Sequence, residues 1–508
     1  MKKLKIIITI LLCLVFVLPL VVSCGKDDSK TNNNNPTAAG DNLDAAEPAE
    51  EKDPDMPNLP ASDMGGKIFT FLCMGTDGDP WIGDIVREEL LGDPINDAAY
   101  NRQMKIEQTY NVKLKQVDGG DYDQVVNSYR TSILAADGSY DAAITRCANF
   151  ISLLTGNYLI DFKELSNIDI DKPYWNKNFY ETMSIMGRHY AADGDLSTKR
   201  LECAWIMAFN KDIIRENGFE SPYDLVKSGQ WTYDKMHEMA RSAAKDLNGD
   251  GKMILEDDMW GLNYTGDTIM GIINGCGVKI AELNSEGIPE LTIGSAVNVE
   301  KMLRIYTDMR DHTYSIDTLF SEKGGVTGLG DVDIFADKRC LFLACATHNI
   351  SYNENTNNKQ SLRTMDVTFG IIPYPKWDVA QSDYLPHTAG HYHPILTVPQ
   401  TNSDLDNTGI ILEALAYEGM KNISPIFYEN LLKTRTTRDE ESAEMIDFIF
   451  GNLSYDVGNM FNFGEILGTF GYNMSTSLKS NIVSTIEKNE GKWQKAIDNM
   501  IAEIEKNS

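Results

Sequence analysis

Short strand-like runs alternate with amphipathic stretches early in the chain, and this rhythm constrains the fold more than any other feature. The runs at 67–74, 112–117 and 140–145 are typical of strands. The stretches between them, at 94–110 and 122–136, have the spacing of helices. Alternation of strand and helix predicts an α/β fold whose neighbouring strands are parallel.

Ligands of such sheets gather at the loops beyond the carboxyl ends of the strands. The first of these loops holds Thr76, Asp79 and Trp81, and the third strand is followed by Arg146 and Asn149. Aromatic rings and planar polar groups suit a ligand that has both C–H faces and hydroxyls. These five residues are therefore candidate ligand-binding residues. The alternative for Trp81 is a surface ring packed on its own helix.

Residues 1–23 have the pattern of a secretory signal peptide: a cationic start, an apolar run over 6–22 and small residues before Cys24. The end of this pattern, Val-Val-Ser-Cys, resembles the bacterial lipobox, in which the cysteine is lipidated and the chain is cut before it. The alternative is an uncleaved anchor helix. We expect acyl chains at Cys24 to hold the protein on the extracellular side of the cell membrane.

The stretch 24–65 has no aromatic residue, four consecutive asparagines and many prolines and acidic residues. Such a composition buries too little apolar surface to offset the entropy of ordering the chain. It predicts a disordered tether. The formal net charge of −29 argues against nucleic acid and anionic lipid as partners, because both require a basic surface.

Beyond Cys24 the chain has six cysteines, none in a CxxC pair and most within apolar runs, which predicts buried small hydrophobic residues and leaves one disulfide open. Further strands are expected at 203–210, 335–346 and 369–375. Thr232 is a predicted helix N-cap, and the C-terminal hundred residues have mainly helical spacing.

Several stretches resemble, in the same order, the sugar-type family 1 of extracellular solute-binding proteins of ABC importers, in its Firmicutes branch. The stretches are 94–102 (PINDAAYNR), 105–112 (KIEQTYNV), 140–143 (YDAA), 158–162 (YLIDF), 208–212 (AFNKD), 231–234 (WTYD) and 436–442 (TTRDEES).

The resemblance implies a two-lobed periplasmic-binding-protein-like fold of type 2, with a hinge. Lobe 1 would take residues 66–200, lobe 2 residues 201–385, and residues 386–425 would return to lobe 1. Residues 426–508 would form helices that brace the lobes. A solute would favour the closed form of this monomer, which would then dock on the permease subunits, and no cofactor is required.

The implied crossovers between lobes lie near 194–201 and 384–392. Further candidate ligand-binding residues lie at these crossovers or at strand ends: Asp195, Trp205, Tyr264, His348, His391 and Tyr392. Core packing is the alternative for Trp205, since Met207 and Phe209 share its face. Trp175 and Trp493 lie in segments that look like surface and are left out.

The segment 246–257 matches the calcium-loop pattern through Asp246, Asn248, Asp250 and Lys252, with Asp257 in place of the usual final glutamate. It predicts a structural calcium ion, and the alternative is a polar turn. His387, His391 and His393 are a weak zinc pattern, because no carboxylate accompanies them in sequence.

These observations favour a lipid-anchored solute-binding protein that captures a carbohydrate, most simply an oligosaccharide, for an ABC importer. The alternatives are a surface glycan-binding protein without its own permease and a surface glycoside hydrolase using two carboxylates. The chain has no Gly-x-Ser-x-Gly elbow, His-Glu-x-x-His helix or phosphate loop, so no enzyme motif is assigned.

Overall fold

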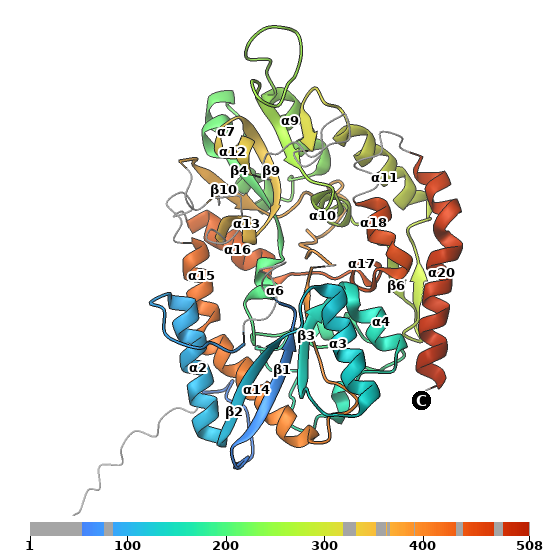
Figure 1. The fold of residues 1–508 in the computed structure, drawn as a ribbon. Coiled ribbons are helices and arrows are strands. Elements are labelled where there is room, and N and C mark those ends of the chain that lie inside the picture. The colour runs from blue at the N-terminus through green and yellow to red at the C-terminus, as the bar shows by residue number, and fades with distance from the viewer. Residues whose placement is uncertain are drawn as a thin grey trace, which may run out of the picture. The chain divides into compact units, whose positions relative to one another are not determined.

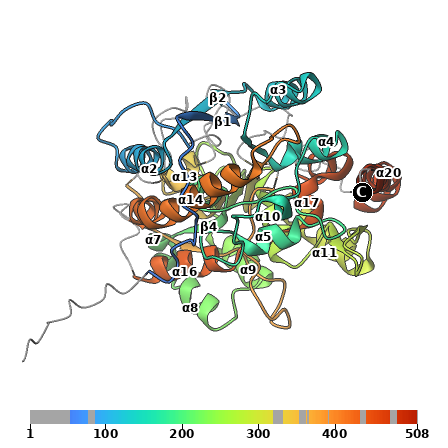
Figure 2. The same ribbon diagram turned by 90° about the horizontal axis from the view of Figure 1, so that it is seen from below.

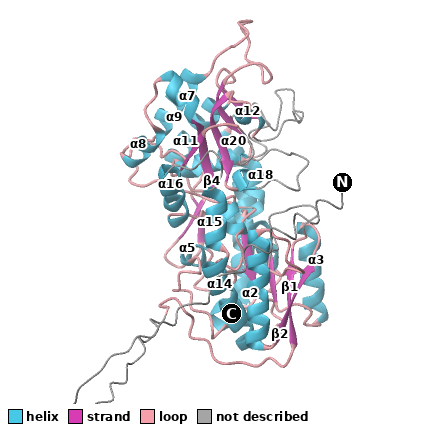
Figure 3. Ribbon diagram, turned by 90° about the vertical axis from the view of Figure 1, so that its left-hand side faces the viewer, coloured by secondary structure: helices cyan, strands magenta, loops and turns pink. Residues whose placement is uncertain are grey.

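The chain folds into two lobes, and each lobe contains one of the two main sheets. Figure 3 shows the two groups of strands in magenta. Residues from Pro54 onward form one compact unit. The computed structural model describes residues 53–75, 85–317, 332–351, 362, 366–390, 392–432, 440–471 and 481–506. Cys24 and the predicted signal peptide therefore lie outside the described residues. None of the described helices has both the length and the apolar character needed to cross a membrane.

The sheet of lobe 1 has the strand order β11-β3-β1-β2. β1 pairs in parallel with β2 and β3, whereas β11 returns from later in the chain and pairs antiparallel with β3. The strands are β1 (Lys67–Cys73), β2 (Val112–Asp118), β3 (Ala142–Arg146) and β11 (Pro394–Thr397). The parallel order confirms the α/β fold predicted from the early rhythm of the sequence.

Local sequence explains where the helices of lobe 1 begin. Asp93 caps α2 by accepting a hydrogen bond from the Asn96 amide, and Asp121 forms a capping box with Gln124 at the start of α3. The helices are α2 (Pro94–Tyr110), α3 (Tyr122–Ala135), η1 (Cys147–Asn149), α4 (Phe150–Thr155), η2 (Phe162–Glu164) and α5 (Lys177–Thr182).

The sheet of lobe 2 has the order β10-β4-β9-β5-β8, and β6 and β7 form a separate pair. Its strands are β4 (Trp205–Asn210), β5 (Trp260–Tyr264), β8 (Ser315–Asp317), β9 (Cys340–Ala346) and β10 (Phe369–Ile372), with β6 (Ala281–Leu283) and β7 (Pro289–Leu291) apart. Its helices are α6 (Lys199–Glu202), α7 (Lys211–Asn217), α8 (Pro222–Lys227), α9 (Tyr233–Ala243), α10 (Thr268–Gly275), α11 (Ala296–Met309), α12 (Asp333–Ala336) and α13 (His348–Ser351).

Thr232 caps α9 as predicted, because its side chain accepts a hydrogen bond from the Lys235 amide. The predicted strand over 335–346 is wrong at its start. Residues up to Ala336 belong to α12, and β9 begins only at Cys340. The polar residues between them form a turn in which Lys338 has a φ of +63°. All six described cysteines are free and buried, which confirms the prediction that they are buried small hydrophobic residues.

The C-terminal part is helical, as predicted: α14 (Leu405–Asn422), α15 (Ser424–Leu432), α16 (Glu440–Gly451), α17 (Val457–Phe461), η4 (Phe463–Glu465), α18 (Ile466–Phe470) and α20 (Ile482–Lys506). α20 runs along both lobes (Figure 1), and the view from below shows it nearly end-on (Figure 2). Its first half, including Trp493, packs in the core of lobe 2, whereas Ile497, Met500 and Ile504 pack in the core of lobe 1. Trp493 is fully buried, so the interpretation of its segment as surface is wrong.

Trp175 is also buried, because its indole N–H donates to a carboxylate oxygen of Glu413 on α14 (2.7 Å). The prediction of a disordered tether is wrong for residues 54–65. The Met64 amide donates to the Tyr110 carbonyl (2.8 Å), and the Ser62 hydroxyl donates to Asn407 (3.0 Å). This segment becomes ordered because its few apolar side chains pack on the core of lobe 1 and its polar groups find partners there. Residues 24–52 lie outside the described part.

Candidate functional site

Three segments of the chain pass between the two sheets side by side. The Trp205 amide donates to the His387 carbonyl (2.8 Å), and the Ala389 amide donates to the Cys203 carbonyl (2.9 Å), so the first two segments pair antiparallel. The Ser454 amide donates to the Pro386 carbonyl (2.7 Å) and adds the third. A short, paired connection of this kind suits a hinge that bends without losing its hydrogen bonds.

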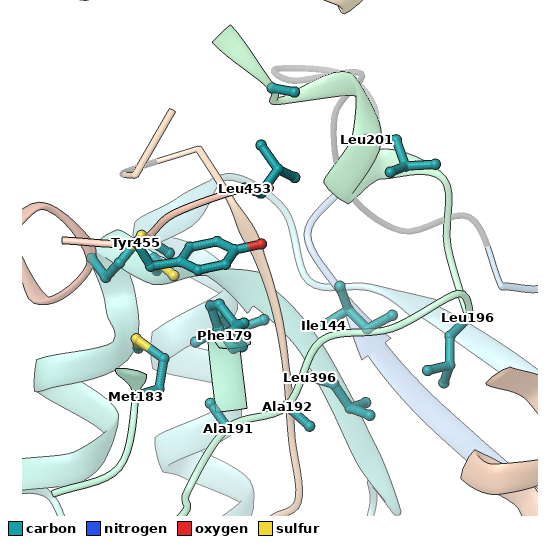
Figure 4. Packing of buried hydrophobic residues seen from close by; sticks show 14 of the residues in the cluster. Ile144, Phe179, Met183, Ala191, Ala192, Leu196, Leu201, Leu396, Leu453 and Tyr455 are labelled. Carbon is teal, nitrogen blue, oxygen red and sulfur yellow. The ribbon is translucent and has the colours of Figure 1, made fainter. Parts of the chain in front are cut away.

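Below these crossings, apolar side chains from distant parts of the sequence form one buried cluster (Figure 4). Phe179 stacks on the ring of His393 (centroids 5.1 Å apart) and meets Tyr455 edge-on (5.4 Å). His393 is held on both sides: Nε2 lies 3.1 Å from the Asp193 carboxylate and Nδ1 lies 3.1 Å from the Thr388 hydroxyl. The cluster therefore fixes the lower end of the crossings.

A cavity of about 850 Å³, here called the solute cavity, lies where β3, β4, α10, the second crossing and the C-terminal helices meet. This volume falls in the range of small-molecule sites. Its lining residues are Arg146, Ala148, Trp205, Gly266, Asp267, Met270, Asn274, His387, Thr388, Gly390, Tyr392, Asn459, Asn462, Glu465, Leu467, Gly468, Thr469, Gly471, Asn489 and Lys492. The cavity lies beyond the carboxyl ends of β3 and β5, where the α/β arrangement places ligands.

Aromatic groups from both lobes line the solute cavity. Trp205 begins β4, and the guanidinium carbon of Arg146 lies 4.4 Å from the centre of the Tyr392 ring. Gly271 lets α10 lie close to Trp205, because a Cβ at this position would come within 3.1 Å of the indole and 2.2 Å of the Tyr374 ring. The site thus offers flat apolar faces beside a planar cation.

The charged groups of the solute cavity include both signs. Lys492 on α20 forms an ion pair with Glu465 (2.8 Å), and this partner lowers the pKa of the Glu465 carboxyl. Burial lowers the pKa of Arg146 from its ordinary value. Asp267 adds a second carboxylate. This mixture does not favour a strongly charged ligand of either sign.

The structure brings three of the predicted ligand-binding residues together: Arg146, Trp205 and Tyr392 all line the solute cavity. Four others do not line it. Asn149 and His348 lie in short helices after β3 and β9, and the Tyr264 hydroxyl donates to the Met309 carbonyl (2.9 Å) within lobe 2. Asp195 pairs with Arg200 (2.7 Å). Thr76, Asp79, Trp81 and His391 lie outside the described residues.

Sequence reasoning missed Asn274, His387 and Asn459 as lining residues. His387 was considered only for zinc, and Asn459 lies in a short helix without a motif. Asn274 gave one signal, since it is a lone amide in the otherwise apolar run at 269–276. A polar residue inside a buried helix needs a partner, and a ligand-facing position could have been inferred from that.

The segment predicted to bind calcium forms a tight, largely exposed turn. Asp246 accepts hydrogen bonds from the amides of Gly249 and Gly251 (both 2.7 Å), and Asn248 accepts one from Asp250 (2.9 Å). The buried residue that closes the turn is Asp258, which accepts from the Leu247 and Ile254 amides. Asp257, the predicted closing ligand, is exposed, and Lys252 donates its amide to Asp250 (2.9 Å).

Among the described residues, no group of three or more histidine, cysteine, aspartate or glutamate side chains could hold a metal ion. The turn at 246–250 supplies only two carboxylates, those of Asp246 and Asp250, and one amide oxygen from Asn248. Of the predicted zinc pattern, His391 lies outside the described part, and His387 and His393 are hydrogen-bonded to Asn459 and Asp193.

No protein-family model matches the chain, and no curated protein matches it in sequence. Solved structures do resemble it. A sugar transporter from Rhizobium etli in an open conformation has a TM-score of 0.54 at 15% identity, over 85% of this chain and 99% of that one. UgpB from Mycobacterium tuberculosis in complex with glycerophosphocholine has a TM-score of 0.53 at 14% identity, over 80% and 97%.

An ABC substrate-binding protein from Listeria monocytogenes in complex with cycloalternan has a TM-score of 0.52 at 13% identity, over 86% of this chain and 98% of that one. At such identities the similarity shows the fold alone: a two-lobed α/β structure of the kind found in ABC solute-binding proteins.

Proposed function

We propose that this protein is an extracellular solute-binding protein, lipid-anchored through Cys24, that captures a carbohydrate between its lobes and delivers it to an ABC importer permease. The observation that carries the proposal is the solute cavity, which lies between two lobes joined by paired crossings. The fold shared with sugar-binding neighbours supports it. Solute bound by both lobes would favour the closed form that a permease recognises.

The lining of the solute cavity supports a saccharide. Trp205 and Tyr392 offer ring faces that can stack on the C–H face of a sugar ring. The amides of Asn274, Asn459 and Asn489 can serve hydroxyls as donors or acceptors. A cavity of about 850 Å³ has room for more than one sugar ring, so we propose an oligosaccharide.

Replacing Trp205 by alanine is expected to weaken saccharide binding by about 10- to 100-fold, because it removes the stacking face. Isothermal titration of the purified chain with maltotriose, cellotriose, xylotriose and mannotriose measures this change. Trp377→Ala is the matched control, since Trp377 stacks on Tyr233 (5.6 Å) away from the solute cavity. Absence of binding and of thermal stabilisation by every sugar would contradict the proposed substrate class.

Two alternatives predict different results in the same samples. A glycoside hydrolase would release shorter sugars from these oligosaccharides, whereas a binding protein returns them intact. A glycan-binding protein without a permease would bind sugar but support no uptake by its cells. The anchor is tested separately: Cys24→Ala is expected to abolish incorporation of labelled palmitate and to release the protein from membranes.

We further propose that the turn formed by Asp246, Asn248 and Asp250 binds a structural calcium ion. Their oxygens gather on one short, exposed segment. Calcium at about 1 mM, the affinity range of extracellular sites, is expected to raise the melting temperature of the wild type but not of Asp250→Ala. Equal melting curves of the wild type with calcium and with EDTA would reject this proposal.

A further inference from the structure

Two buried amide side chains line the solute cavity with polar atoms that have no partner. Asn274 is 5% exposed, and neither its Oδ1 nor its Nδ2 has a hydrogen-bond partner within the described structure. Asn459 is 2% exposed, and its Oδ1 lacks a described partner as well. Buried polar atoms are nearly always paired, because desolvation without a hydrogen bond is costly. The missing partners are therefore expected from a ligand.

His387 determines which way the Asn459 amide points. The His387 ring hydrogen-bonds to the Ser454 backbone, and this hydrogen bond acts to raise the pKa of the ring. The ring N–H is therefore the donor, and the Ser454 carbonyl oxygen accepts. A neutral imidazole has one N–H, and burial keeps this ring neutral by lowering its pKa to about 3. Nε2 must then accept from the Asn459 Nδ2, 3.0 Å away. The amide is thus fixed with its oxygen left for another donor.

Asn274 and His387 lie at a junction. Both also line a smaller cavity of about 280 Å³ that extends past Asp456 and Tyr455, so they form the partition between it and the solute cavity. Asn274 belongs to α10, all eight residues of which are buried. A ligand group that enters the solute cavity to this depth meets a carboxamide with a free donor and a free acceptor.

The unpaired atoms define the chemistry of the group that binds them. The two acceptor oxygens, one from each amide, and the Asn274 amide nitrogen, which carries two N–H donors, match a ligand that donates at least twice and accepts at least once. Adjacent hydroxyls of a neutral sugar do both. A carboxylate or phosphate supplies mainly acceptors and would face the two amide oxygens unfavourably.

We propose that Asn274 and Asn459 are specificity-determining residues that bind neighbouring hydroxyls of a neutral saccharide and discriminate against an anionic group at this point. This inference rests on the proposed function and deepens it. His387 acts as a positioning residue, because it orients Asn459 without supplying the unpaired atoms itself.

Asn274→Leu separates a ligand-binding role from a structural one, since leucine has a similar volume and no polar atoms. The apo variant is expected to melt at or above the wild-type temperature, because an unpaired buried amide is removed. Its affinity for the neutral trisaccharides named above is expected to fall by at least about tenfold. Asn127→Leu is the control: Asn127 is an exposed residue of α3 that does not line the solute cavity, and its Oδ1 accepts a hydrogen bond from Arg130 (3.1 Å).

Titration calorimetry and melting curves give outcomes that can be told apart. If the wild type binds none of the sugars, the proposed function and this inference both fail. If the wild type binds a sugar and Asn274→Leu binds it within about threefold, only the inference fails. A large loss of apo stability in Asn274→Leu would assign the residue a structural role. Tighter binding of maltobionic acid or glucose 6-phosphate than of the neutral sugars would overturn the discrimination.

Discussion

Replacing Trp493 by alanine is expected to lower the free energy of unfolding by about 3–5 kcal/mol, the usual effect of truncating a fully buried tryptophan. The indole packs against Phe470 (ring centroids 5.5 Å apart) and lies close to Gly464. Because α20 packs in the cores of both lobes, loss of this anchor also loosens the wall that carries Asn489 and Lys492. Urea unfolding followed by circular dichroism measures the change.

Trp493→Phe is the informative control for this effect. The indole Nε1 is buried and has no hydrogen-bond partner in the described part of the chain, so phenylalanine keeps most of the packing and removes an unpaired donor. We expect Trp493→Phe to lower the free energy of unfolding by less than half as much as Trp493→Ala does. Lys495→Ala changes an exposed residue of the same helix and should have little effect. An alanine variant as stable as the wild type would show that α20 does not anchor lobe 2.

The second large effect concerns pH and Asp456. This carboxylate caps α17 and accepts hydrogen bonds from the amides of Ile280 (2.7 Å) and Asn459 (2.8 Å). Burial nevertheless raises its pKa to about 7. An aspartate in the unfolded chain titrates near pH 4, so between about pH 4 and 7 the folded state holds one more proton than the unfolded state.

This proton sets the sign of the pH dependence. Stability falls as pH rises wherever the folded state binds more protons, so Asp456 is expected to lower the free energy of unfolding by up to about 1.4 kcal/mol per pH unit from pH 4 to 7. Above pH 7 its contribution is constant. Urea unfolding at several pH values, with Asp456→Asn subtracted from the wild type, isolates the effect.

Asp137→Asn is the matched control for Asp456. Asp137 is fully exposed, and hydrogen bonds from Ser132 and Ser139 lower its pKa, so it is ionised in both states from about pH 5 to 7. Its difference from the wild type is expected to stay flat there. A flat difference for Asp456→Asn over the same window would show that the carboxyl is ionised in the folded protein at pH 5.

Local sequence was sufficient for the elements of lobe 1. The helix at 94–110 was predicted with its observed bounds, because Asp93 and Pro94 begin it and Asn111, with a φ of +47°, ends it. The first two strands were predicted to within one residue, because each ends just before a turn that contains glycine. The α/β class followed from the order of these elements, and each of these signals is contained in a few neighbouring residues.

Tertiary structure decided what neighbours in sequence cannot encode. Residues 54–65 look disordered by composition but become ordered on α2 and α14 through partners such as Tyr110 and Asn407. Trp493 looks exposed in a helix rich in charge, yet Phe470 covers it. The amides of Asn274 and Asn459 come from segments about 185 residues apart and line one cavity only when the lobes assemble.

The residues of the candidate site also fall into two groups: those that the sequence could predict and those that only the folded structure reveals. Arg146, Trp205 and Tyr392 could be proposed from sequence, because each adjoins a strand end or a crossover and carries a group that suits sugars. The unpaired amides could not, since a missing hydrogen-bond partner is a property of the folded surroundings and not of the residue. Sequence alone determined the α/β class and the kinds of group on offer. Only the packing of the two lobes and α20 decided which of those groups share one cavity.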